Sequence, residues 1–208
     1  HNAMKDKGIK PIIGCETYIA PCPRTVKSID VPNVRGFHLI LLAENQKGYH
    51  NLCKLISEAH TSGFYYKPRI DKELLREYHE GIIGMSACIQ GEIAQAALLR
   101  DYEGAKEALT EYLDIFGRKN FYLEIMSHRT KDPVPADIRD DYNEMIEQQD
   151  KINRILLKLS RDVEVPVVAT NDCHYLRKEH AKAHEVMLCI QTRTTMEMSK
   201  RMRLSSEE

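Results

Sequence analysis

The sequence contains no tryptophan and no long apolar run, and neither sign of charge predominates. The longest uninterrupted apolar stretch, residues 39–43, is far shorter than the roughly 20 residues that a membrane-crossing helix needs, so we expect no membrane contact. Lys and Arg together number 30 against 31 Asp and Glu. This balance excludes a polybasic arm that binds nucleic acid by charge alone, but it permits a local basic groove.

The six cysteines form no Cys-x-x-Cys pair, and the glycine-rich phosphate loops of common nucleotide-binding folds are absent. The first residues lack the charged-then-apolar pattern of an export signal, which favours reduced thiols in a cytoplasmic protein. Residues 1–3 precede Met4, and we interpret them as an expression-tag remnant.

Apolar runs alternate with longer segments of helical periodicity, a pattern typical of an α/β fold. We predict strands at 11–19, 37–43, 81–86, 121–126 and 165–169. The continuous apolar character of 37–43 favours a strand covered on both faces, as in a parallel sheet. In parallel barrels the chemistry lies at the carboxyl ends of the strands, so polar residues at those ends are the site candidates.

The most informative of these ends is the stretch from Ala169 to Tyr175. Residues i and i+2 of a strand share a face, so Asp172 and His174 are expected to point into the same space. A carboxylate and an imidazole are both good ligands for Zn, Mn or Fe. The alternative is that Asp172 caps the next helix and His174 lies in a polar seam.

Three further side chains stand out near strand ends. Glu16 interrupts an apolar strand, where a carboxylate must be paired, metal-bound or at a wet end. His38 begins an apolar strand, and its alternative role is that of a hydrogen-bonded core histidine. Cys88 follows a strand, and its alternative role is that of a small buried apolar residue. Together with Asp172 and His174, these three side chains make up a set that is typical of a polynuclear metal centre, where divalent ions activate water and clamp a phosphate.

A weaker candidate is His128, which follows a strand containing Glu124. We do not include His128 in the ligand set. The basic residues near the C-terminus alternate with glutamates, which favours a solvated face, with a nucleic-acid-facing edge as the alternative.

Six segments, in order along the chain, resemble the PHP (polymerase and histidinol phosphatase) domains at the N-terminus of bacterial DNA polymerase III alpha subunits. They are Gly8 to Glu16, Phe37 to Ala43, Gly63 to Asp71, Ser86 to Glu92, Ala169 to Tyr175 and Ala183 to Thr192. The resemblance implies a distorted (β/α)7 barrel with a metal site at one mouth. It also implies a partial PHP domain over residues 4–192, followed by a polar tail, 193–208, that leads toward the next polymerase domain.

The resemblance carries the family's metal ligands onto Glu16, His38, Cys88, Asp172 and His174, with Zn, Mn or Mg as the expected ions. It implies a metal-dependent 3′–5′ exonuclease or phosphoesterase site within a DNA-directed DNA polymerase. The expected partners of that parent protein are primer–template DNA and other replicase subunits. Two alternatives are a non-catalytic scaffold PHP domain and a stand-alone PHP phosphatase.

The sequence departs from the family in one respect. The family's opening His-x-His strand and a later Asp-His pair are absent, so about four of nine expected ligands are missing. We therefore expect an incomplete barrel, weak or absent metal binding, and no activity of this chain by itself. An incomplete barrel also leaves an edge strand unpaired, through which copies of the chain are expected to associate.

Overall fold

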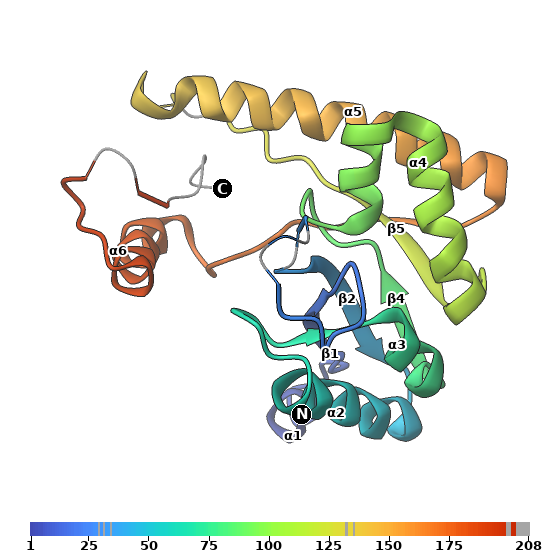
Figure 1. Cartoon of the computed structure of the whole chain (residues 1–208). Helices are drawn as coiled ribbons and strands as arrows, with labels where there is room; N and C mark the ends of the chain where they lie inside the picture. The colour runs from blue at the N-terminus through green and yellow to red at the C-terminus, as the bar shows by residue number, and fades with distance from the viewer. Residues whose placement is uncertain are drawn as a thin grey trace.

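The computed structural model describes residues 1–28, 30, 32–33, 35–131, 133–134, 136–198 and 201–202. It is a mixed α/β fold in which helices pack on a six-stranded sheet (Figure 1). Residues 199–200 and 203–208 of the expected polar tail lie outside the described residues.

Six strands and six α-helices, with two short 3-10 helices, make up the described fold. The strands are β1 (Ile13–Ile19), β2 (Phe37–Ala43), β3 (Arg69–Ile70), β4 (Ile82–Met85), β5 (Phe121–Ile125) and β6 (Val167–Ala169). The α-helices are α1 (Asn2–Lys5), α2 (Gln46–Thr61), α3 (Lys72–Tyr78), α4 (Glu92–Phe116), α5 (Arg139–Val163) and α6 (Ala181–Thr192). The 3-10 helices are η1 (Ala136–Ile138) and η2 (Lys178–His180).

The strand order is β3-β1-β2-β4-β5-β6, and hydrogen bonds among the described residues do not close the sheet into a barrel. All five predicted strands are present, with β3 in addition. The expectation of a parallel sheet is wrong for β2, which pairs antiparallel with both β1 and β4. Parallel neighbours need a crossover, usually a helix, whereas the described residues between β1 and β2 include no helix.

The sheet has one well-covered face at β1 and β2. Thr17 and Ile19 of β1 and Leu39 and Leu41 of β2 are buried, and Leu55 of α2 belongs to the same core. The residues of β2 that alternate with them are only partly buried and Glu16 of β1 is exposed, which corrects the prediction that 37–43 is covered on both faces. The second face is where Glu16 and His38 lie, because each alternates with the buried set.

Helices α2 and α3 begin at capping residues. The side chain of Asn45 accepts a hydrogen bond from the Gly48 amide at the start of α2. The Asp71 side chain does the same for the Leu74 amide at the start of α3. Helix α4 is one run of 25 residues that is kinked at Asp101, where φ is 56°.

Helix α6 lies apart from the sheet and from α2–α5, at the end of residues 170–177 (Figure 1). Its surface is rich in exposed apolar side chains, among them Met187 and Ile190. None of the helices in the described ranges combines the length and the apolar character needed to cross a bilayer.

Helix α2 packs closely on the turn that precedes β4. Gly48 and Gly81 are in backbone contact there, and a Cβ atom added at Gly48 would overlap the Gly81 carbonyl oxygen. The Gly81 carbonyl also accepts the Glu44 amide at 2.9 Å, which ties the end of β2 to this turn. Neither backbone can move away without disturbing the sheet.

The substitution Gly48→Ala should therefore destabilise the fold by about 3 kcal/mol, through overpacking of one backbone against another. Urea unfolding measures the change. The control is Lys47→Ala, one residue away, whose side chain is exposed and forms only a 3.7 Å surface ion pair with Glu80. Equal unfolding midpoints for the two variants would contradict this account of the contact.

Candidate functional site

Three of the five predicted site residues are in direct contact. Glu16 lies on β1 and His38 near the start of β2, and their side chains approach to 3.2 Å (Oε1 to Nδ1). The Cys88 sulfur, in the loop after β4, lies 3.6 Å from the same Nδ1. His38 is near the carboxyl end of β1 because β2 is antiparallel, which explains how a residue at the start of a strand joins the others.

Asp172 and His174 come from the segment between β6 and η2. The expectation that they lie on a strand is wrong, because β6 ends at Ala169 and the chain is irregular from residue 170 to 177. Both still lie near the same region: the charge of Asp172 acts on Cys88, and both side chains act electrostatically on His128. His174 is exposed, and its Nδ1 lies 2.7 Å from the backbone oxygen of Asp172.

The surroundings of Cys88 disfavour its thiolate. Burial, and then the negative charges of Asp172 and Glu16, raise the pKa of Cys88 to about 12. The sulfur is therefore a neutral thiol at pH 7, whereas cations bind the thiolate. A cation would have to displace the thiol proton in order to bind there.

Glu124 connects the two segments that carry these side chains. Its buried carboxylate accepts the amide of Ala87, next to Cys88, and the hydroxyl of Thr170, at 2.9 Å. Its own amide donates to the Ser86 hydroxyl at 2.8 Å. Burial raises the pKa of Glu124. The sequence showed a carboxylate in an apolar strand, but only the fold shows that it joins the β4 and β6 loops.

His128 is held by a residue that the sequence analysis did not single out. Gln149 of α5 is buried, and its amide nitrogen lies 2.8 Å from Nδ1 of His128. Its carbonyl oxygen accepts the His128 backbone amide at 2.9 Å. Burial lowers the pKa of His128, which favours the neutral ring. The burial of Gln149 depends on how α5 packs, so the sequence carried no signal for this contact.

The donor types suit a divalent cation, but their arrangement is incomplete. Ligands of one tetrahedral zinc ion lie about 3.3–3.8 Å apart, close to the two contacts that His38 makes. Nevertheless, across the described part of the chain, no group of three or more His, Cys, Asp or Glu side chains could hold a metal ion as it stands.

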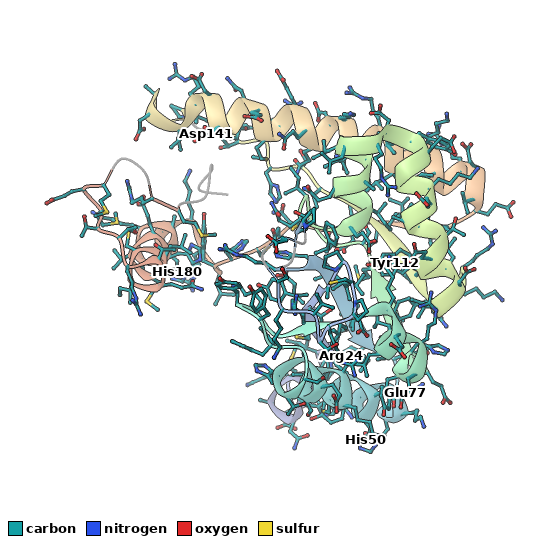
Figure 2. All side chains as sticks on the ribbon, in the orientation of Figure 1. Arg24, His50, Glu77, Tyr112, Asp141 and His180 are labelled. Carbon is teal, nitrogen blue, oxygen red and sulfur yellow. The ribbon has the colours of Figure 1, made fainter. Side chains whose placement is uncertain are left out.

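A surface hollow elsewhere on the molecule does not suit an anion. It is lined by Arg24, Asp71, Glu73 and Glu77, among others, and Figure 2 labels Arg24 and Glu77 near α3. The guanidinium of Arg24 is engaged by Asp71 at 3.1 Å, and the remaining charged lining is acidic. An anion would meet net negative charge there.

Comparisons with known proteins agree with the resemblance. Residues 1–128 match the PHP domain family. The DNA polymerase III subunit alpha of Chlamydia trachomatis is 40% identical over 205 residues, which cover 96% of this chain and 16% of that protein. The subunits of Borreliella burgdorferi (40% over 208 residues, 100% and 17%) and Thermus aquaticus (41% over 206 residues, 97% and 15%) are similar to the same extent. The chain thus spans about a sixth of the length of these relatives.

The role of Glu124 can be tested with two variants. Glu124→Ala leaves the buried Ala87 amide without its acceptor and should cost about 2 kcal/mol of unfolding free energy. Glu124→Gln keeps an acceptor for Ala87 and a partner for Thr170, and should cost much less. Urea unfolding measures both, and equal losses would contradict the assigned hydrogen bonds.

The pH dependence has a definite sign. The raised pKa means that the folded state binds the Glu124 proton more readily than the unfolded state, where the ordinary value is near 4.5. The unmodified chain should therefore lose stability relative to Glu124→Gln as the pH rises from 4.5 through the raised value. A constant difference across that range would contradict the burial of this charge.

Proposed function

Because this chain belongs to the PHP domain family, we propose that it is the PHP part, over residues 4–192, of a DNA polymerase III alpha subunit. The whole protein would then synthesise DNA, with primer–template DNA and other replicase subunits as its partners. Within it, we propose that the site around His38 is a metal-dependent phosphoesterase that removes nucleotides from DNA 3′ ends.

The observation that carries the proposal is the convergence on His38 of donors that are distant in the sequence. Glu16 and Cys88 both contact its ring, and Asp172, in the segment after β6, acts electrostatically on Cys88. Carboxylate, imidazole and thiol groups that come together without an evident structural reason are typical of cation sites. The proposed ligands are these four residues and His174.

The five donors are not arranged to hold an ion within the described residues, so the proposal includes a completing contribution from elsewhere in the parent protein. The family's His-x-His strand and Asp-His pair are the proposed contributors. A bound divalent ion would supply the activation of water and the clamping of a phosphate. The residues of this chain would hold and orient the ion, and Gln149 would fix the ring of His128 beside it.

A scaffold is the second candidate function. It is favoured by the direct contacts among Glu16, His38 and Cys88, which satisfy one another without a cation. The isolated chain also has an unpaired edge: β3 covers only Tyr18 and Ile19 of β1, and the exposed Ile12 and Ile13 lie at the other end of that strand. We propose that copies of the isolated chain associate along this edge.

The test uses the full-length polymerase subunit that contains this chain. Asp172→Asn and His38→Asn should each lower manganese- or zinc-dependent removal of 3′-terminal nucleotides by at least about 100-fold, and should lower the bound metal measured by elemental analysis. The matched controls are Asp114→Asn and His50→Asn, both exposed on helices.

The outcomes separate the two functions. Full hydrolysis and metal content in both site variants, with lower unfolding midpoints, would establish the scaffold and overturn the phosphoesterase. Turnover of a small phosphomonoester without any action on DNA would instead indicate a stand-alone type of PHP phosphatase.

A further inference from the structure

A row of aromatic and basic side chains leads away from His38 across the end of the sheet. We define this aromatic–basic strip by five residues: Tyr18, Arg35, Tyr65, Tyr66 and Lys67. We propose that the strip binds single-stranded DNA and directs its 3′ end toward the site at Glu16 and His38. The direction of the bound DNA strand rests on the proposed function, whereas the binding of DNA to the strip does not.

The strip starts in contact with the site. The ring of Tyr18 meets the ring of His38 edge-on, with centroids 5.1 Å apart, because the two residues are register partners of β1 and β2. The Lys67 ammonium lies 5.2 Å from the centre of the Tyr18 ring. A cation and an aromatic surface therefore lie next to the candidate site.

The strip continues through a tight turn. The amide of Tyr65 donates to the carbonyl of Lys67, which leaves Tyr66 at the tip with φ of 59°. A bulky residue in this left-handed region is uncommon and costs conformational energy. The turn presents the ring of Tyr66, whose residue is 58% exposed, and Arg35 lies 5.2 Å from that ring's centre.

The base of the strip is rigid. The rings of Tyr65 and Tyr66 pack edge-to-face with centroids 4.7 Å apart, and the guanidinium of Arg69 lies 5.3 Å from the Tyr65 ring. Arg69 is fully buried and donates to the carbonyl oxygens of Gly63 and Arg24. The buried arginine thus fixes the turn to the neighbouring loop, so little ordering is required when a ligand binds.

The chemistry of the strip suits a single strand. Exposed aromatic rings stack on unpaired bases, and nearby cations neutralise phosphates. In the part of the chain that the structure describes, neither Arg35 nor Lys67 forms an ion pair with a carboxylate. The acidic neighbour of Tyr65 is Asp30, whose carboxylate accepts the Ser28 hydroxyl at 3.0 Å. Duplex DNA hides its base faces and would use only the two cations.

The test measures the affinity of this chain for a fluorescein-labelled oligo-dT of about 12 nucleotides, by fluorescence anisotropy in the presence of EDTA. Asparagine tolerates positive φ. The substitution Tyr66→Asn should therefore weaken binding about 5-fold or more through lost stacking. Lys67→Ala should weaken binding and should reduce the slope of log Kd against log salt by about 0.7, as expected for one phosphate contact.

The controls match each variant. Lys54→Ala removes another lysine that lies over a tyrosine ring, 5.0 Å from the centre of Tyr78. Tyr49→Asn removes another exposed tyrosine, next to His50, which Figure 2 shows at the outer side of α2. Both should bind as the unmodified chain does. Urea unfolding of each variant establishes that its fold is intact.

Several results would overturn the proposal. These are absence of binding by the unmodified chain, equal weakening by the control variants, equal affinity for duplex DNA, or equally effective competition by inorganic polyphosphate. Because EDTA removes divalent cations, a failure of metal-dependent hydrolysis in the parent protein leaves this result unaffected. Conversely, if the strip does not bind single-stranded DNA, the proposed metal site is still tested separately by the metal content of the parent protein.

Discussion

The antiparallel pairing of β1 with β2 is the constraint on which the candidate site depends. In this register Tyr18 faces His38 and Ile19 faces Phe37, so β2 begins where β1 ends. A parallel β2 would place His38 at the opposite end of the strands, far from the loops that follow β4 and β6. The contacts of His38 with Glu16 and Cys88, and the ring contact with Tyr18, all follow from this one reversal of direction.

Glu124 adds a second constraint from the other half of the sheet. Its carboxylate is buried at a cost, and the hydrogen bonds from Ala87 and Thr170 offset that cost. The same bonds set the distance between the loop of Cys88 and the segment that leads to Asp172. The fold thus relates the proposed donors through backbone and side-chain hydrogen bonds, in a region where they do not yet form a cation site.

Local signals made much of the fold predictable. The caps at Asn45 and Asp71 are signals of this kind, because capping depends on residues only three positions apart. Strand direction could not be predicted for β2, since an apolar run looks the same in either orientation. Strand β3 has only two residues, and it exists because they pair with Tyr18 and Ile19, about fifty positions earlier.

The candidate site, like the fold, could be predicted from the sequence only in part. Unexpected polar residues in apolar runs identified Glu16 and His38, because burying such groups requires a partner. The strand geometry expected for Asp172 and His174 was wrong, since β6 ends before them, but their approach to Cys88 and His128 comes from the path of the chain after Thr170. The part played by Gln149 depends on how α5 packs, which no local pattern encodes.

The burial of Cys88 has a consequence for chemical labelling. Alkylating reagents attack the thiolate, so a thiol with a pKa of about 12 reacts slowly at neutral pH, and its burial slows the reagent further. Cys53 and Cys173 are exposed and will be modified first. Since Cys173 stands between Asp172 and His174, a maleimide dye attached there would report on the motion of that loop while leaving the buried sulfur untouched.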